Sequence, residues 1–360
     1  MRMNNRIKLK YLALVVILIF HMTGCGVLNA KNNIDLEKAC ICVVETRGYD
    51  AQSALVFYDE SLEEVGVFPL YYATLGQIFY TPSVYNGELY IVPQGIADRK
   101  DEKKVLKVNL SSLNTEIYTI DQYAINSISV NDNFIYSANT LNGDSHISKC
   151  NKSNKLVSEY VIERMYVSKL VCTDKRVFAF ASISEKLQFK SYLFIFDEEL
   201  NLLNQVDITE YGYDQYKAVI KGDMLYFSNS TANNDYARET VGVYSIADNS
   251  ISVIKLSNDY PHDIMFYDNK LLVSHFDIVT HQGGGLSIYN LETKEMKYLK
   301  LNHGAAQMTI KGDYIYFLDR YKVYKYKLES NDLKYEKMVE IPPLCENYYY
   351  TTGLFSFGDN

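Results

Sequence analysis

The chain has 360 residues, of which 48% are hydrophobic and 22% are charged, a composition typical of globular proteins with one large or two medium domains. Its formal net charge is −8, and without the first 24 residues, which hold four basic and no acidic side chains, it is −12 (32 basic against 44 acidic). Such a surface repels phosphate backbones, which excludes nucleic acid as an expected partner, and it does not attract anionic lipid headgroups. The 33 tyrosines and 16 phenylalanines favour β-strands.

The N-terminus has the parts of a secretion signal. A basic stretch ends at Lys10, and an apolar run from Tyr11 to Phe20 follows it. This run is shorter than the roughly 18–20 apolar residues that span a bilayer as a helix. Its length and its basic flank are therefore typical of a signal peptide.

The residues from Met22 to Cys25 (MTGC) resemble the lipobox of bacterial lipoproteins, with methionine where that family usually has leucine. The resemblance implies cleavage before Cys25 and attachment of a diacylglycerol to its thiol. We expect a signal peptide over residues 1–24, then the lipidated cysteine and a tether over residues 25–35. Two acyl chains, such as palmitate, suffice for stable anchoring on the extracytoplasmic side of the cell membrane. An uncleaved N-terminal anchor and an ordinary secretory signal are the alternatives.

A turn followed by an alternating apolar strand recurs along the rest of the chain. Residues 221–227 (KGDMLYF) and 311–317 (KGDYIYF) are near copies at an offset of 90 residues. Six such turns lie at intervals of 45, 42, 48, 46 and 44 residues, so the near copies are two periods apart. The second residues of these turns are Gly87, Asp132, Asp174, Gly222, Asp268 and Gly312.

A second pattern accompanies each turn. It consists of a strand, a polar hairpin turn and another strand, occurs seven times, and is clear in residues 286–301 (LSIYNLETKEMKYLKL). Because a further apolar run precedes each turn, one unit has four short strands over about 40–50 residues, the period of a β-propeller blade. The chain has no tryptophan, so these units are not of the Trp-Asp type.

The two ends of the chain are complementary. Residues 351–358 form a first strand and its turn without a second strand, and Gly358 lies 46 residues after Gly312. Residues 37–46 form a second strand without a first. We therefore expect an all-β fold over residues 36–360: a seven-bladed β-propeller with four-stranded blades, whose C-terminal strand joins the N-terminal blade. This closure removes open sheet edges; an irregular β-sandwich is the alternative.

The repeats resemble those of seven-bladed propellers with YVTN-type repeats. The unit at residues 270–301 carries the resemblance most clearly, since its LSIYNLETKEM segment matches that family's third strand, turn and fourth strand. The resemblance covers roughly residues 36–360 and implies architecture only, because such propellers serve many functions.

Four of the six histidines fall near loops that a propeller places on one face. Two lie just before first strands and two in a long loop between second and third strands of the fifth and sixth complete repeats. Neutral imidazole binds metals and titrates near physiological pH, so a metal or acid/base site is one interpretation, and polar loop residues without chemistry are the other. The candidate ligand-binding residues are His262, Asp263, His275, His281, His303 and Gln307.

Other motifs add little chemistry. The glycine-rich segment 280–287 lacks the Lys-Ser/Thr pair of a phosphate-binding loop and is expected to let a long loop turn back into a strand. The sequence has neither the Cys/His ligand spacing of a zinc site nor the acidic motif of a calcium-binding loop. Tyrosine-rich segments at 69–80, 211–219 and 346–352 lie at first strands, where tyrosines suit either peptide or glycan contact or channel packing.

The sequence therefore predicts a non-enzymatic lipoprotein whose propeller binds a protein, peptide or glycan, without a cofactor. An enzyme with its site at the channel mouth, similar to lactonase or lyase propellers and possessing a divalent metal near His262 and His303, is one alternative. A structural subunit of an envelope assembly is the other. The cysteines Cys40, Cys42, Cys150, Cys172 and Cys345 are expected to be buried free thiols, with a Cys150–Cys172 disulfide left open.

Overall fold

The structure is a computed structural model, and residues Ile34–Asn360 form one compact unit. The signal peptide, Cys25 and most of the tether lie outside the described residues. No helix in the described part of the chain is long and apolar enough to cross a membrane. The described residues are 34–47, 52–77, 81–94, 102–185, 188–213, 215–229, 239–278, 280–343 and 349–358.

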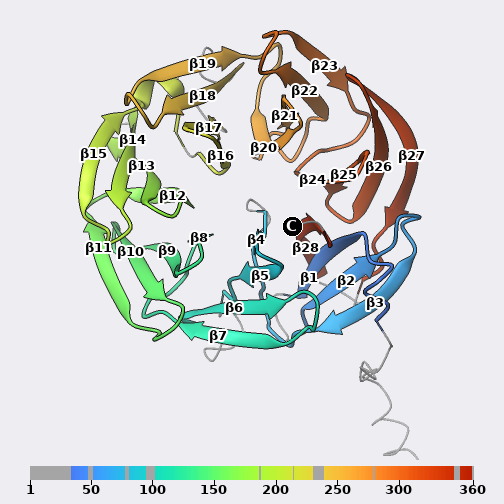
Figure 1. Ribbon diagram of the computed structural model, residues 1–360, viewed down its shortest axis with the longest axis horizontal. Helices are drawn as coiled ribbons and strands as arrows, with labels where there is room; N and C mark the ends of the chain where they lie inside the picture. Colours follow the sequence, from blue (N-terminus) through green and yellow to red (C-terminus); the bar gives the residue numbers. More distant parts are fainter. Residues whose placement is uncertain are drawn as a thin grey trace, which may run out of the picture. The chain divides into compact units, whose positions relative to one another are not determined.

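The described strands of this unit form seven four-stranded antiparallel sheets, which are the blades of a β-propeller (Figure 1). We number them from the blade that holds both ends of the propeller chain. The innermost strands of blades 1 to 7 are β28 (Tyr349–Ser356), β4 (Ser83–Tyr85), β8 (Ser127–Val130), β12 (Tyr166–Cys172), β16 (Ala218–Lys221), β20 (Pro261–Tyr267) and β24 (Gln307–Lys311).

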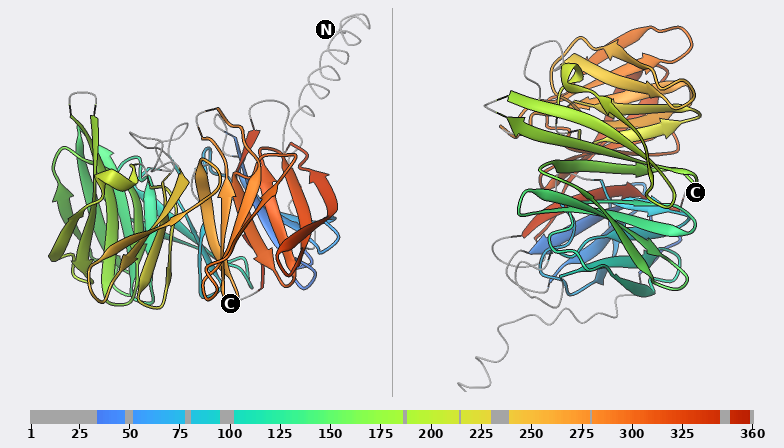
Figure 2. Two further views of the ribbon diagram at one scale, coloured as in Figure 1. Left: turned by 90° about the horizontal axis from the view of Figure 1, so that it is seen from above. Right: turned by 90° about the vertical axis from the view of Figure 1, so that its left-hand side faces the viewer.

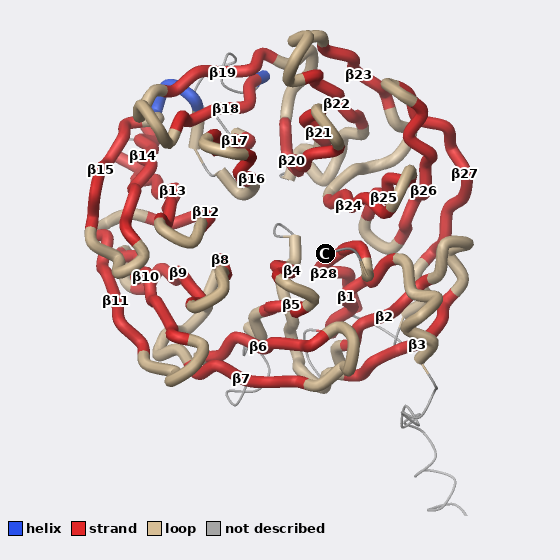
Figure 3. The backbone as a smooth tube through the Cα atoms, viewed as in Figure 1, coloured by secondary structure: helices blue, strands red, loops and turns tan. Residues whose placement is uncertain are grey.

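The other strands follow outward in the same blade order (Figure 3). The second strands are β1 (Ile41–Arg47), β5 (Glu88–Ile91), β9 (Phe134–Leu141), β13 (Arg176–Glu185), β17 (Met224–Ser228), β21 (Lys270–His275) and β25 (Tyr314–Asp319). The third are β2 (Ala54–Tyr58), β6 (Lys104–Asn109), β10 (Asp144–Asn151), β14 (Gln188–Asp197), β18 (Thr240–Ser245), β22 (Gly285–Asn290) and β26 (Lys322–Glu329). The outermost are β3 (Glu64–Pro69), β7 (Thr115–Thr119), β11 (Val157–Ile162), β15 (Leu202–Asp207), β19 (Ile251–Lys255), β23 (Met296–Lys300) and β27 (Asp332–Glu340).

Blade 1 confirms the predicted closure of the ring. Its innermost strand β28 comes from the C-terminus and pairs with β1 from the N-terminal side, with Leu354 opposite Val43. The backbone N–H of Phe357 donates to the carbonyl of Cys40 at 2.8 Å and extends the pairing by one residue. The strand starts at Tyr349, two residues before the predicted start. In Figure 2 the blades are seen from the side.

The hairpin turns between third and fourth strands explain the second sequence pattern. The side-chain oxygen of Asn151 accepts hydrogen bonds from the backbone of Ser153 and Asn154 at 2.9 and 3.2 Å. Asn290 holds Glu292 and Thr293 in the same way at 2.8 and 3.0 Å. An asparagine at the end of the third strand thus supplies the local bonds that reverse the chain.

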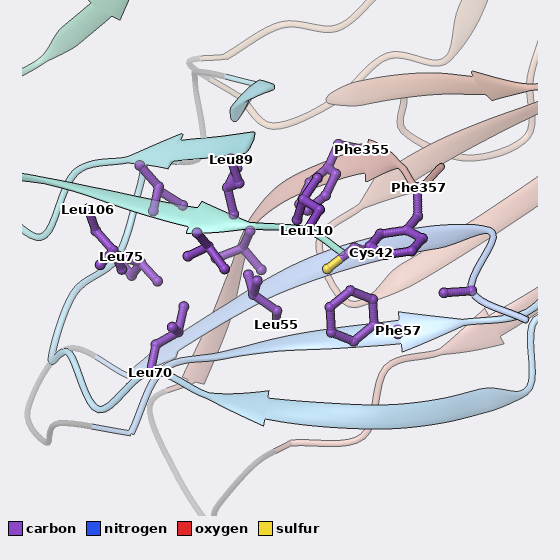
Figure 4. Close-up of a cluster of buried hydrophobic side chains, with 14 residues drawn as sticks. Cys42, Leu55, Phe57, Leu70, Leu75, Leu89, Leu106, Leu110, Phe355 and Phe357 are labelled. Carbon is purple, nitrogen blue, oxygen red and sulfur yellow. The ribbon is translucent and has the colours of Figure 1, made fainter. Parts of the chain in front are cut away.

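The hydrophobic core lies between neighbouring blades. Figure 4 shows the cluster between blades 1 and 2, where Leu55 and Phe57 of β2 pack toward Leu89 and Leu106 of blade 2. The ring of Phe57 also meets that of Phe357 edge to face, with centroids 5.4 Å apart. Each blade is therefore stabilised by burying its two faces against its neighbours, which is why blades of a propeller need the closed ring.

The described cysteines are free thiols. Cys40, Cys42 and Cys150 are buried, and Cys172 is half-buried, where its sulfur lies 3.1 Å from the hydroxyl of Ser129. Cys150 and Cys172 therefore do not form the disulfide that the sequence left open. Cys345 lies outside the described residues.

Hydrogen bonds from polar side chains also join the innermost strands. The hydroxyl of Ser127 in blade 3 accepts from the backbone N–H of Leu170 in blade 4 at 2.9 Å. The side-chain oxygen of Gln307 in blade 7 accepts from the N–H of Leu354 in blade 1 at 2.8 Å. These bonds connect residues 43 and 47 positions apart, about one repeat, and they satisfy backbone donors at the inner edge of the next blade.

Candidate functional site

The repeat places equivalent residues of the seven blades in one ring around the central axis. In each blade, the residue that belongs to this ring lies five positions before the second residue of the repeated turn. It stands just before the innermost strand or where the regular pairing of that strand begins. We call these residues the channel ring: Pro82, Ser127, Lys169, Lys217, Asp263, Gln307 and Gly353.

Contacts between neighbouring members support this alignment. A side chain added at Gly353 would lie 2.2 Å from Cγ of Pro82, which joins blades 1 and 2 tightly. The Nζ atom of Lys217 lies 3.6 Å from Oδ1 of Asp263, between blades 5 and 6. The channel ring is therefore uncharged on the side of Gly353, Pro82 and Ser127, and its charged members lie in blades 4 to 6.

A cavity of about 400 Å³ occupies the channel beside this ring. Four polar ring members (Ser127, Lys169, Lys217, Asp263) line it, and aliphatic side chains from innermost and second strands form much of the remaining wall. A concave space with a few convergent polar groups among apolar walls is typical of a small-molecule site. The aliphatic wall includes Ile91, Ile128, Val171, Val219 and Met265.

Lys217 and Asp263 form a buried polar network. Lys217 is 4% exposed, and its ammonium also donates to the hydroxyl of Thr81, which lies two residues before β4 of blade 2. Asp263 is 4% exposed, and its Oδ2 accepts from the N–H of Met308 in blade 7 at 2.9 Å. The network therefore holds four blades together as well as contributing charge to the cavity.

Lys169 brings a second ammonium group to the same space from blade 4. Its side chain is half-buried because it borders the cavity. Burial and the charge of Lys217 lower the pKa of Lys169 to about 8, while Asp263 opposes this effect. Burial also lowers the pKa of Lys217, and the carboxylate of Asp263 again acts in the opposite direction. Burial disfavours the charged form of both lysines, and for Lys169 the like charge of Lys217 adds to this effect.

His262 precedes Asp263 in β20 and is 1% exposed. Its ring packs against Phe276 with centroids 5.6 Å apart, and its Nδ1 atom has no hydrogen-bond partner among the described residues. Burial lowers the pKa of His262 to about 3, with Lys217 adding to the effect and a bond to the backbone of Ala306 opposing it. The ring is therefore neutral at physiological pH.

The structure places His275 at the end of β21, beside a second cavity of about 370 Å³. Its Nδ1 lies 2.7 Å from the carbonyl oxygen of Asp259, and its Nε2 lies 2.8 Å from the hydroxyl of Ser287. Both ring nitrogens are thus engaged by oxygens, and burial lowers the pKa of His275. The nearby His281 is exposed in the loop, where its ring meets Phe276 at 6.3 Å.

His303 lies before β24 in a ring stack. Its imidazole stacks on Tyr324 at 3.6 Å, its Nε2 lies 2.8 Å from the hydroxyl of Tyr326, and its Nδ1 lies 2.6 Å from the carbonyl of Gly304. Burial lowers the pKa of His303. Gln307 is fully buried, and its side-chain oxygen binds blade 1 by accepting the hydrogen bond from the N–H of Leu354.

The six predicted residues thus lie in four places. His262 and His281 pack against Phe276, which lines the second cavity together with His275. His303 lies in its own aromatic stack, Gln307 is bonded to blade 1, and of the six only Asp263 lines the channel cavity. Within the described part of the chain, no group of three or more His, Cys, Asp and Glu side chains is arranged to hold a metal ion.

Sequence reasoning missed the two cavity lysines. Lys169 and Lys217 look like ordinary surface residues in the sequence, because each is a single charge near the start of a strand. The signal that finds them is the repeat itself: counting five residues back from Asp174 and Gly222 gives both positions, and Asp268 gives Asp263.

Comparison with known proteins supports the fold. The chain is similar in structure to a functionally unknown protein from Desulfotomaculum acetoxidans, with a TM-score of 0.58, 11% identity, and coverage of 85% of this chain and 99% of that one. AztD from Citrobacter koseri matches with a TM-score of 0.55, 10% identity and coverage of 89% and 99%. Hydrazine synthase from Kuenenia stuttgartiensis matches with a TM-score of 0.53 and 14% identity, and the match covers 71% of this chain and 78% of that one.

No protein-family model matches the chain, and no curated protein matches its sequence. At such low identities the structural likeness shows a shared propeller fold and nothing about activity.

Proposed function

We propose that this chain is an extracytoplasmic, lipid-anchored binding protein whose propeller holds a peptide or glycan ligand in the central channel. The observation that carries the proposal is the cavity of about 400 Å³ beside the channel ring. Its convergent polar groups favour a small ligand, or a segment of a larger one, over a flat protein surface. The assignment of the repeats to the YVTN type belongs to the same proposal.

The lipid anchor rests on the residues before the propeller. Replacing Cys25 by serine removes the thiol that would carry the diacylglycerol, so we expect bacterial cells fed with radiolabelled palmitate to label the wild-type chain and not the variant. The wild-type chain should sediment with membranes, whereas variant chains whose signal peptide has been removed should not. Equal labelling of both chains would contradict the anchor at this residue.

Blocking the channel tests the ligand site. Val219 lines the cavity from β16 and is half-buried, so Val219→Trp places a larger ring in the space. Binding of four small probes, N-acetylphenylalanine, its amide, glucuronate and glucuronamide, would be measured by calorimetry. We expect at least one probe to bind the wild type and to lose most of its affinity for the variant.

The control for this experiment is the exposed substitution Leu203→Trp on the outermost strand β15, which leaves the channel unchanged. Both variants must show a cooperative thermal transition before their binding is compared. Probes that bind Val219→Trp as tightly as wild type, or fail to bind wild type at millimolar concentration, would contradict a ligand site in the channel.

A further inference from the structure

The innermost strands place a collar of aliphatic side chains next to the channel ring. Four of its members stand two residues after the ring member of their blade, in blades 2, 4, 5 and 6, and the fifth directly follows the ring member of blade 3. Each one lines the channel cavity and is half-buried, so part of its apolar surface stays exposed at the cavity. The members of this aliphatic collar are Val84, Ile128, Val171, Val219 and Met265.

The core holds these five side chains in place. Each collar member packs against a different one of the described core clusters. Val171, for example, packs on the cluster that contains Phe178 and Phe227, and Met265 packs on the cluster that contains Phe317. The collar is therefore a preformed apolar surface, which a ligand can occupy without the cost of ordering it.

Polar side chains beside the collar are already used within the protein. The hydroxyl of Ser129 donates to the sulfur of Cys172 at 3.1 Å and accepts from the N–H of the same residue at 2.9 Å. In blade 7 the hydroxyl of Thr309 accepts from the N–H of Ser356 at 3.0 Å. Among the described residues that line the cavity, Tyr90 is the only aromatic one, and it is fully buried. The collar thus presents aliphatic surface without an aromatic face on which a sugar ring could stack.

We infer that the aliphatic collar binds an aliphatic group of the ligand, with the polar part of the ligand toward the channel ring. This inference rests on the proposed function and specifies the chemistry of the ligand. Moving an aliphatic group out of water onto the collar is favourable, whereas sugar hydroxyls in the same place would lose their hydrogen bonds to water. The group is either the branched side chain of a peptide or a linear acyl chain, two sources that the test separates.

The test uses uncharged probes, so that the charged members of the channel ring do not decide the outcome. N-acetylleucinamide and N-acetylasparaginamide have side chains of nearly the same shape, one apolar and one polar. Hexanamide and butanamide are linear chains that differ by two methylene groups.

Calorimetry on the wild-type protein is expected to show a preference within at least one of these pairs. The leucine probe should bind roughly 10-fold or more tightly than the asparagine probe if the natural ligand is a peptide side chain. Hexanamide should bind about 15-fold more tightly than butanamide if it is an acyl chain, since each buried methylene contributes about four-fold.

A nearly isosteric double substitution makes the collar polar. Val171→Thr with Val219→Thr replaces one methyl by a hydroxyl group in each of blades 4 and 5. We expect this variant to bind the preferred aliphatic probe about 5- to 150-fold more weakly, the cost of burying an unpaired hydroxyl. If the variant does not fold, Met265→Gln gives the same comparison.

Val157→Thr with Val161→Thr is the matched control, because both valines lie on the outermost strand β11 and are 41% exposed. This double substitution should leave the binding of every probe unchanged.

Equal affinity within both pairs of probes, unchanged binding of the aliphatic probe by the collar variant, or no binding of either aliphatic probe at millimolar concentration would overturn the inference. If polar and apolar probes bind the wild type equally and both lose binding in Val219→Trp, the channel site stands and only the aliphatic assignment fails. Binding that survives Val219→Trp overturns both.

Discussion

A chain that ends before β28 is expected to lose cooperative folding altogether. Removing residues 349–360 deletes the innermost strand of blade 1 and leaves β1 with only one of its two antiparallel partners, β2. It also removes Phe355 and Phe357 from the core between blades 1 and 2. Losing one large buried ring costs about 3–5 kcal/mol, and whole domains are stable by only about 5–15 kcal/mol. Urea unfolding followed by circular dichroism would measure the loss.

A chain that ends at Gly358 is the control for this truncation, because it retains all of β28 and should unfold like the full-length chain. The shorter chain should expose an open sheet edge and aggregate. A cooperative transition in the shorter chain at the same urea concentration as in the control would show that the ring does not depend on its C-terminal strand.

Asp263→Ala is expected to destabilise the propeller by about 3–5 kcal/mol, the usual cost of removing one member of a buried ion pair. The substitution leaves the ammonium of Lys217 buried without its carboxylate and removes the acceptor of the Met308 N–H. The free energy of unfolding in urea at neutral pH would give the effect.

Two further variants separate charge from backbone bonding. Asp263→Asn keeps an oxygen that can accept from Met308 and removes only the charge. The double variant Lys217→Met with Asp263→Asn removes both charges and should be more stable than Asp263→Ala. If Asp263→Ala unfolds at the same urea concentration as wild type, the buried pair contributes nothing to the contact between blades.

The repeat in the sequence was enough to predict the blades because its signals are local. Asn86 and Gly87, with φ of 50° and 71°, form the tight turn that the sequence pattern indicates, since both conformations suit these residue types. The side chains of Asn151 and Asn290 close the outer hairpins in the same local manner. Ring closure followed from the incomplete units at the two ends.

The candidate site was harder to predict, because it depends on contacts between blades. Lys217 meets Thr81, 136 positions away in the chain, and no local pattern encodes such a pair. Equal spacing from the turn locates a residue around the ring, but it does not reveal which neighbours face it across the channel. The histidines stood out by rarity, and the structure gives His275 and His303 hydrogen-bond partners at both ring nitrogens.

The most direct test of the account is a crystal structure of residues 34–360 with N-acetylphenylalanine or glucuronate. We expect electron density for the acid inside the channel, against the aliphatic wall of the cavity. Density for the acid only on the outer surface, or a channel ring that does not enclose a cavity, would contradict it.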